Sequence, residues 1–208
     1  MKLLFFGDSI TDARRNRESD FNDRLGAGFV MQVAGELLLE NPTEYEIVNR
    51  GIGGERIVDM YARIKKDVWN ENPDVLTVLE GINDISHEVW HQNGVETERW
   101  ANIYERMLKE SIQRLPNTKI IVGEPFVLHG EISNANFEEY DKIRERAAIL
   151  REITKELGIY YLPLQAVVDE KAEMYGDNVV LGDGVHPTVY GAKLIAREWL
   201  RLFETIKR

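Results

Sequence analysis

Two short segments near opposite ends of this chain contain a serine, an aspartate and a histidine, the side-chain types that together activate a hydroxyl as a nucleophile. Apolar residues 3–6 lead into Gly7-Asp8-Ser9, the pattern of a buried strand that carries a serine at its carboxyl end. Far along the chain, Asp183 and His186 lie three residues apart. A serine needs a histidine to accept its proton, and that histidine needs a third group to orient it. We therefore expect a catalytic triad of Ser9, His186 and Asp183.

Two further positions could supply the hydrogen-bond donors that such a site needs. Attack on a carbonyl group places negative charge on its oxygen, and each donor aimed at that oxyanion is worth roughly 2.7–4 kcal/mol. We expect Gly54, the side chain of Asn83 and the backbone N–H of Ser9 to form this oxyanion hole. The alternative is that the glycines only form tight turns and the asparagine caps a helix. For Gly51 and Gly53 we favour the turn.

Four other side chains are candidates for a substrate pocket, each with a structural alternative. For Asp8, support of the turn before the serine is the favoured role, and for Arg56 it is an ion pair or a solvated surface position. Trp90 could stack on a sugar ring, or it could pack against a neighbouring subunit. His129 follows the fourth predicted strand and could line the pocket.

Short apolar strands that alternate with amphipathic helical segments must position these residues. The strands are predicted at 2–6, 45–48, 75–79, 119–123 and about 159–162, and the helices at about 27–40, 57–70, 97–115, 138–157 and 188–206. This alternation predicts a three-layer α/β/α sandwich around a five-stranded parallel sheet. Because the carboxyl ends of parallel strands meet at one rim, residues 9, 51–54 and 81–84 should converge there, and the 183–186 loop must fold back to join them.

Length, composition and charge narrow the class of protein. A chain of 208 residues with 43% hydrophobic and 30% charged residues favours one globular domain spanning residues 1–208. The net charge of −10 argues against a nucleic-acid partner or an anionic membrane surface. The absence of cysteine excludes a disulfide or a thiolate site. With no signal-like segment and no apolar run near 18 residues, we expect a cytoplasmic protein.

The ordered motifs resemble the SGNH hydrolase superfamily, also called the GDSL esterases and lipases. Its four named residues match Ser9, Gly54, Asn83 and His186 in order and context, and its Asp-x-x-His-Pro ending matches residues 183–187. Ile10 stands where the usual motif has leucine. Within the superfamily the motifs are most similar to those of bacterial carbohydrate acetylesterases, including intracellular acetylxylan esterases.

This resemblance implies a serine esterase that needs no cofactor and no metal. It implies a small-molecule or oligosaccharide ester as substrate, most often an O-acetylated sugar, and an acyl-enzyme intermediate on the serine. It also implies a homo-oligomer, because intracellular members of the group often self-associate.

Three alternatives remain open at this stage. The first is another activity of the same superfamily, that of a thioesterase or a lysophospholipase. The second is a metal-dependent phosphoesterase with Asp8, Asp84, Asp183 and His186 as ligands, although the chain lacks the His-Glu-x-x-His motif. The third is a carbohydrate-binding protein without catalysis, against which the complete set of catalytic residue types argues.

Overall fold

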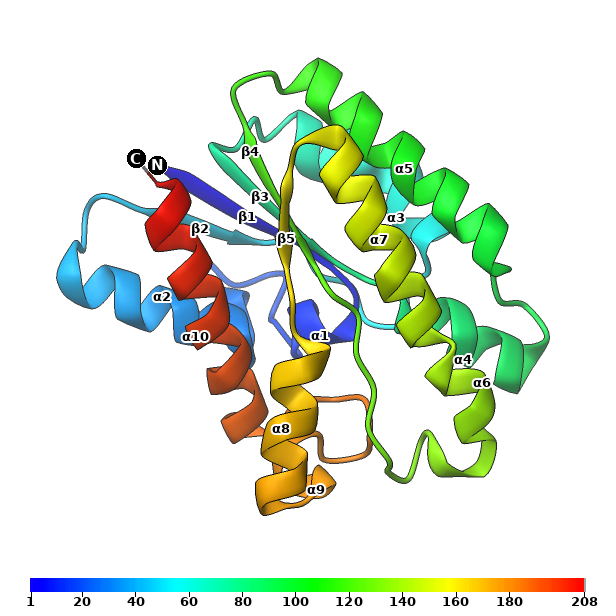
Figure 1. The fold of residues 1–208 in the computed structure, drawn as a ribbon. Helices are drawn as coiled ribbons and strands as arrows, with labels where there is room; N and C mark the ends of the chain where they lie inside the picture. Colours follow the sequence, from blue (N-terminus) through cyan, green and yellow to red (C-terminus); the bar gives the residue numbers. More distant parts are fainter. Residues whose placement is uncertain (208) are drawn as a thin grey trace.

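The computed structural model describes residues 1–207, and a five-stranded sheet lies at its centre (Figure 1). Its strands are all parallel and run in the order β2-β1-β3-β4-β5. They are β1 (Lys2–Gly7), β2 (Glu46–Asn49), β3 (Val75–Leu79), β4 (Lys119–Gly123) and β5 (Tyr160–Leu162). Strands β1, β3 and β4 are nearly continuous apolar runs because helices cover both of their faces.

Two layers of helices enclose this sheet (Figure 1). One layer contains α2 (Phe29–Glu40), α8 (Gln165–Tyr175) and α10 (Val189–Ile206), and the other contains α3 (Ile57–Ile64), α5 (Thr97–Arg114) and α7 (Ile143–Leu157). Successive side chains of a strand point to opposite faces, so Leu3 and Phe5 pack with the first layer and Leu4 and Phe6 with the second. The predicted α/β/α sandwich with a five-stranded parallel sheet is confirmed.

The helix boundaries differ from the predicted ones in two places. The helix predicted over 138–157 is divided into α6 (Phe137–Asp141) and α7, because the chain turns at Lys142. The helix predicted over 57–70 changes after α3 to a π-helical segment, Lys65–Trp69.

Four helices were not predicted, namely α1 (Ser9–Asp12), α4 (Ile82–His91), α8 and α9 (Asp177–Val180). Helices α1 and α9 span only four residues each, which is too short for a periodic apolar pattern. Helix α4 matters most for the site, because it begins directly after β3 and carries Asn83 in its first turn.

The sheet order places the ends of β1 and β3 next to each other. Strand β2 lies on one side of β1, and β3, β4 and β5 follow one another on its other side. The strand order therefore reverses between β1 and β3. Such a reversal leaves a crevice at the carboxyl ends of the strands, where ligands of parallel α/β proteins bind. Ser9 follows β1 at this crevice and Asn83 follows β3.

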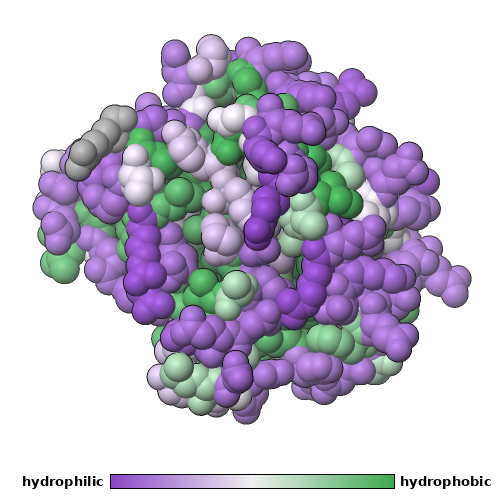
Figure 2. Space-filling view, in the orientation of Figure 1, coloured by the Kyte–Doolittle hydropathy of each residue, from purple (hydrophilic) through white to green (hydrophobic). Residues whose placement is uncertain are grey.

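The face of the molecule shown in Figure 2 is mostly polar. Figure 2 shows hydrophilic residues over most of the face that is viewed in Figure 1, with apolar residues between them. Within residues 1–207, no helix combines the length and the apolar character needed to cross a membrane.

Candidate active site

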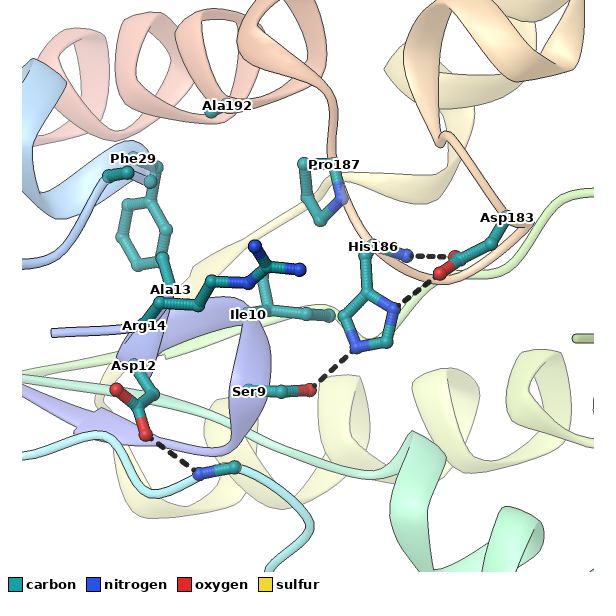
Figure 3. A pocket seen from close by; sticks show the side chains of 13 residues that line it. Ser9, Ile10, Asp12, Ala13, Arg14, Phe29, Asp183, His186, Pro187 and Ala192 are labelled. Atoms are coloured by element: carbon teal, nitrogen blue, oxygen red, sulfur yellow. Dashed lines mark hydrogen bonds and ion pairs between the residues drawn. The ribbon is translucent and has the colours of Figure 1, made fainter.

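A chain of hydrogen bonds joins the serine, the histidine and the aspartate (Figure 3). Ser9 is the first residue of α1, and its Oγ lies 3.0 Å from Nε2 of His186. Nδ1 of the same ring lies 2.7 Å from Oδ2 of Asp183. These distances allow the imidazole to accept a proton from the hydroxyl while the carboxylate holds the ring in place.

Asp183 is held as a charged group by its own loop. Its Oδ1 accepts the backbone N–H groups of Val185 at 3.0 Å and His186 at 2.8 Å. Burial by itself would raise the pKa of Asp183, but these hydrogen bonds and the imidazole lower it below its ordinary value. A carboxylate at this position favours a proton on Nδ1 of His186 and leaves Nε2 as the acceptor that faces Ser9.

The 183–186 loop folds back to the rim of the sheet, as expected, and it rests on the segment after β4. Leu128 donates its N–H to the carbonyl of Gly184 at 2.9 Å, and Ile132 donates to the carbonyl of Asp183 at 3.0 Å. Gly130 fits directly beneath, because a Cβ atom there would lie only 2.2 Å from the carbonyl carbon of Asp183. This role of Gly130 was not predicted, since a single glycine after a strand does not indicate which segment packs on it.

The residues proposed for the oxyanion hole besides Ser9 are Gly54, in the segment after β2, and Asn83, at the start of α4. The side chain of Asn83 donates to the carbonyl of Glu55 at 2.9 Å, which ties the start of α4 to the loop that contains Gly54. Gly54 has a φ of +82° and open space around its Cα. Neither its N–H nor that of Ser9 donates to an acceptor in residues 1–207, so both groups are available to a substrate oxygen.

The segment after β2 is packed tightly against α1. A side-chain oxygen of Asp12 accepts the N–H of Gly53 at 3.0 Å. A Cβ atom at Gly51 would lie 2.3 Å from the backbone nitrogen of Asp12, so only glycine allows this approach. Asn49 adds two hydrogen bonds, from Nδ2 to the carbonyls of Thr11 at 2.7 Å and Leu25 at 2.8 Å. The close approach to Asp12 gives Gly51 a structural role, whereas Gly53 also lines the cavity beside Ser9 and has room for a Cβ atom.

Three buried carboxyl groups lie beneath the site. Asp8, Glu80 and Asp84 are each at most 1% exposed. Burial raises the pKa of Asp8 to about 7. Burial also raises the pKa of Asp84, and burial together with the neighbouring Asp84 raises that of Glu80 well above its usual range. Asp84 accepts the N–H of Ile57 at the start of α3, and Glu80 accepts the indole N–H of Trp100 at 3.1 Å.

The four ligands of the metal alternative do not form a metal site. Asp183 and His186 bond to each other, whereas Asp8 and Asp84 belong to the buried group beneath the serine. Throughout residues 1–207, no three carboxylate or imidazole groups are arranged to bind a metal ion.

A cavity of about 620 Å³ opens beside Ser9 and His186. Ile10, Phe29 and Pro187 form an apolar side of it, and Arg14 and Asp12 are among its charged residues (Figure 3). Arg14 and Phe29 were not predicted, because residues 13–29 contain no motif that indicates their position relative to the serine.

The four side chains predicted for the pocket do not line this cavity. Arg56 forms an ion pair with Asp59 and donates to the carbonyl of Asn93, which is the ion-pair role that we favoured. Asp8 is buried and accepts the N–H of Ile10, as the N-cap of α1. Trp90 and His129 make their contacts elsewhere.

Trp90 is 53% exposed on α4. His129 stacks on Phe137 with 3.6 Å between ring centroids, and its Nδ1 lies 3.0 Å from Oδ1 of Asn134. The backbone N–H of His129 also donates to Oδ2 of Asp177 at 3.2 Å. Neither Trp90 nor His129 is among the residues that line the cavity.

Comparison with known proteins relates this geometry to one family. The family described as GDSL-like lipase/acylhydrolase matches residues 5–194. An acetylxylan esterase from Geobacillus stearothermophilus is 32% identical over 210 residues, which cover 96% of this chain and 92% of the esterase.

Solved structures agree with this relationship. A putative GDSL-like lipase from Parabacteroides merdae has a TM-score of 0.87 at 32% identity, covering 96% of this chain and 94% of that one. Axe2, an acetylxylan esterase from G. stearothermophilus, has a TM-score of 0.85 at 29% identity, covering 96% and 92%. Solved catalytic mutants of Axe2 replace a serine, an aspartate or a histidine by alanine.

Proposed function

This chain belongs to the GDSL-like lipase/acylhydrolase family of esterases, and we propose that it removes acetyl groups from sugars or oligosaccharides through Ser9, His186 and Asp183. The observation that carries the proposal is the hydrogen-bonded chain from Ser9 Oγ to His186 at 3.0 Å and on to Asp183 at 2.7 Å, beside an open cavity. The same three residue types are replaced in the catalytic mutants of the related Geobacillus esterase.

The reaction begins when Nε2 of His186 accepts the proton of Ser9 and Oγ attacks the ester carbonyl carbon. The carbonyl oxygen becomes an oxyanion, which the N–H groups of Ser9 and Gly54 and the amide of Asn83 stabilise. Nδ2 of Asn83 donates to the Glu55 carbonyl at 2.9 Å and more weakly to Oδ2 of Asp8 at 3.4 Å. An oxyanion would replace Asp8 as the acceptor of the longer hydrogen bond, while the bond to Glu55 is kept.

Collapse of this intermediate breaks the bond between the acyl carbon and the alcohol oxygen. His186 gives its proton to the leaving alcohol, and the acyl group stays on Ser9. A water molecule then gives a proton to His186 and attacks the acyl carbon. Breakage of the bond to Oγ releases the acid, and Ser9 regains its proton from the histidine.

The acetyl specificity is supported by the relatives named as acetylxylan and acetyl-xylooligosaccharide esterases. The thioesterase and lysophospholipase activities of the same superfamily are the competing possibilities. Rates on p-nitrophenyl esters from acetate to octanoate, on acetylated xylo-oligosaccharides and on an acyl-CoA separate the three. We expect acetate to be cleaved far faster than octanoate, and a preference for octanoate or for the thioester would refute the acetyl assignment.

The role of Ser9 has a direct test. We expect Ser9→Ala to remain folded, with an unchanged circular dichroism spectrum, and to lose both ester hydrolysis and covalent labelling by a serine-directed organophosphonate. Ser86, which is buried and donates to the carbonyl of Ile82 within α4, offers a matched Ser→Ala control that should retain labelling. A folded Ser9→Ala protein with wild-type rates would overturn the proposal.

We also propose that the chain forms a homo-oligomer. A tryptophan that is half exposed is a common anchor of protein interfaces, and Trp90 is such a residue on α4. Sedimentation equilibrium should give a mass above one chain, and Trp90→Ala should lower it. A single-chain mass for the wild type at high protein concentration would refute this.

A further inference from the structure

Two consecutive residues at the end of α1 have a backbone conformation that side chains disfavour. Ala13 has a φ of 43° and Arg14 a φ of 60°, both in the left-handed region. The turn is held from both sides, because Ala27 donates to the carbonyl of Ala13 at 2.9 Å and Arg15 donates its backbone N–H to Asp12 Oδ1 at 3.0 Å. Strain of this kind persists only where the surroundings enforce it, and it concentrates at functional sites.

The strained turn places the Arg14 side chain at the cavity. Arg14 lines the cavity together with Ser9 and His186. In the view of Figure 3 its guanidinium group extends from the turn after α1 between Phe29 and Pro187, on the side of the imidazole. An anionic group on a substrate bound at Ser9 would therefore meet this guanidinium.

The other charged groups of the cavity already have partners. Asp12 accepts the N–H of Gly53 and forms an ion pair of 2.7 Å with Arg17, and Asp183 is bonded to His186. Arg14, by contrast, makes no hydrogen bond or ion pair with any other part of the chain between residues 1 and 207. In a protein with a net charge of −10, the uncommitted charge at this cavity is thus positive.

We propose that Arg14 binds an anionic group, a carboxylate or a phosphate, on the alcohol part of the ester substrate. A guanidinium group recognises both through paired N–H donors. The inference rests on the proposed function: an acetyl group carries no charge, so the anion must belong to the alcohol. The preferred substrates are accordingly acetyl esters of acidic sugars or of sugar phosphates, rather than of neutral sugars.

Matched substrates and variants test this assignment. The substrates are a mono-O-acetylated methyl glucoside, the corresponding glucuronoside and the corresponding 6-phosphate, which differ only in the group at one carbon. Arg14→Gln removes the charge and keeps most of the length, whereas Arg14→Lys keeps the charge. Arg24→Gln is the control, because Arg24 is also exposed and near in sequence but does not line the cavity.

For the wild type we expect kcat/KM on at least one anionic ester to exceed that on the neutral ester by about tenfold. Arg14→Gln should bring this ratio close to one, because the variant loses the advantage on the anionic esters, whereas Arg14→Lys should retain part of the preference. Arg24→Gln should keep the full ratio. Comparison of the two anionic esters identifies the carboxylate or the phosphate as the better ligand.

Two further measurements separate the role of Arg14 from effects on folding and on catalysis. Arg14→Gly accepts the left-handed backbone, so it should fold with a raised Tm and still lose the preference. Calorimetric titration with the deacetylated glucuronoside and 6-phosphate measures anion binding without catalysis. If no acetyl ester is cleaved but Arg14→Gln weakens this binding, only the proposed function fails. Equal binding by wild type and Arg14→Gln, or a preference that survives in Arg14→Gln, would overturn the role of Arg14.

Discussion

Replacement of Asp8 by asparagine should change how the stability of this protein depends on pH. The Asp8 carboxyl group is 1% exposed and receives the N–H of Ile10 at 2.9 Å, with the amide of Asn83 at the longer distance of 3.4 Å. Burial raises its pKa from 3.8 to about 7, because the charged form loses its hydration. In the folded chain this group therefore stays protonated through the weakly acidic range.

The magnitude follows from the difference between the folded and unfolded pKa values. Between pH 3.8 and about 7 the unfolded chain has lost the Asp8 proton and the folded chain keeps it. The stability that the neutral group contributes is complete below the unfolded pKa and is lost as pH rises through the folded pKa. The full difference corresponds to roughly 4 kcal/mol, of which roughly 2.7 kcal/mol is lost between pH 5 and pH 8.5.

Urea unfolding of wild type, Asp8→Asn and Asp8→Ala at several values between pH 5 and pH 8.5 measures this effect. Relative to both variants, the wild type should lose about 2–3 kcal/mol across the range. The two variants should differ from each other by a constant amount, because alanine also loses the hydrogen bond from Ile10. Glu80 and Asp84 are present in all three proteins, and because the charge of Asp8 contributes to the raised pKa of Glu80, the difference reports Asp8 together with its effect on Glu80. If the difference in unfolding free energy between wild type and both variants did not change with pH, a raised pKa of Asp8 would be refuted.

Three other substitutions probe the supports of the site and the core. Gly130→Ala should lower kcat far more than it raises KM, because its Cβ would lie 2.2 Å from the carbonyl carbon of Asp183 and displace the 183–186 loop. Steady-state kinetics with an unchanged kcat would contradict that packing. Gly54→Ala has free space but a φ of +82°, so we expect roughly 1–2 kcal/mol of lost stability in urea unfolding, and no loss would show that the turn relaxes. Trp199→Phe removes a buried 2.8 Å hydrogen bond to Thr77 and should cost about 1–3 kcal/mol by the same assay; an unchanged midpoint would mean that the hydroxyl finds another partner.

The strands could be predicted because burial on both faces requires apolar residues along their whole length. The predicted ranges 75–79 and 119–123 coincide with β3 and β4. Strands β1 and β5 differ from prediction by one residue at one end, and β2 is shifted by one residue at both ends. The short helix α1 and the polar helix α4 could not be predicted in this way. Helix α1 is too short to show a periodic apolar face, and its position depends on the cap at Asp8. The apolar face of α4 has only Ile82, Ile85 and Val89, and the position of this helix also depends on the contact of Asp84 with the start of α3.

The sequence by itself determined which residue types are present, their order along the chain and the rim to which parallel strands bring Ser9 and Asn83. Only the tertiary structure decided the rest, because it depends on contacts between segments that no local pattern encodes. The docking of the 183–186 loop on Gly130 sets the 3.0 Å distance between Ser9 and His186. Burial by neighbouring helices sets the protonation of Asp8, and a left-handed turn directs Arg14 to the cavity.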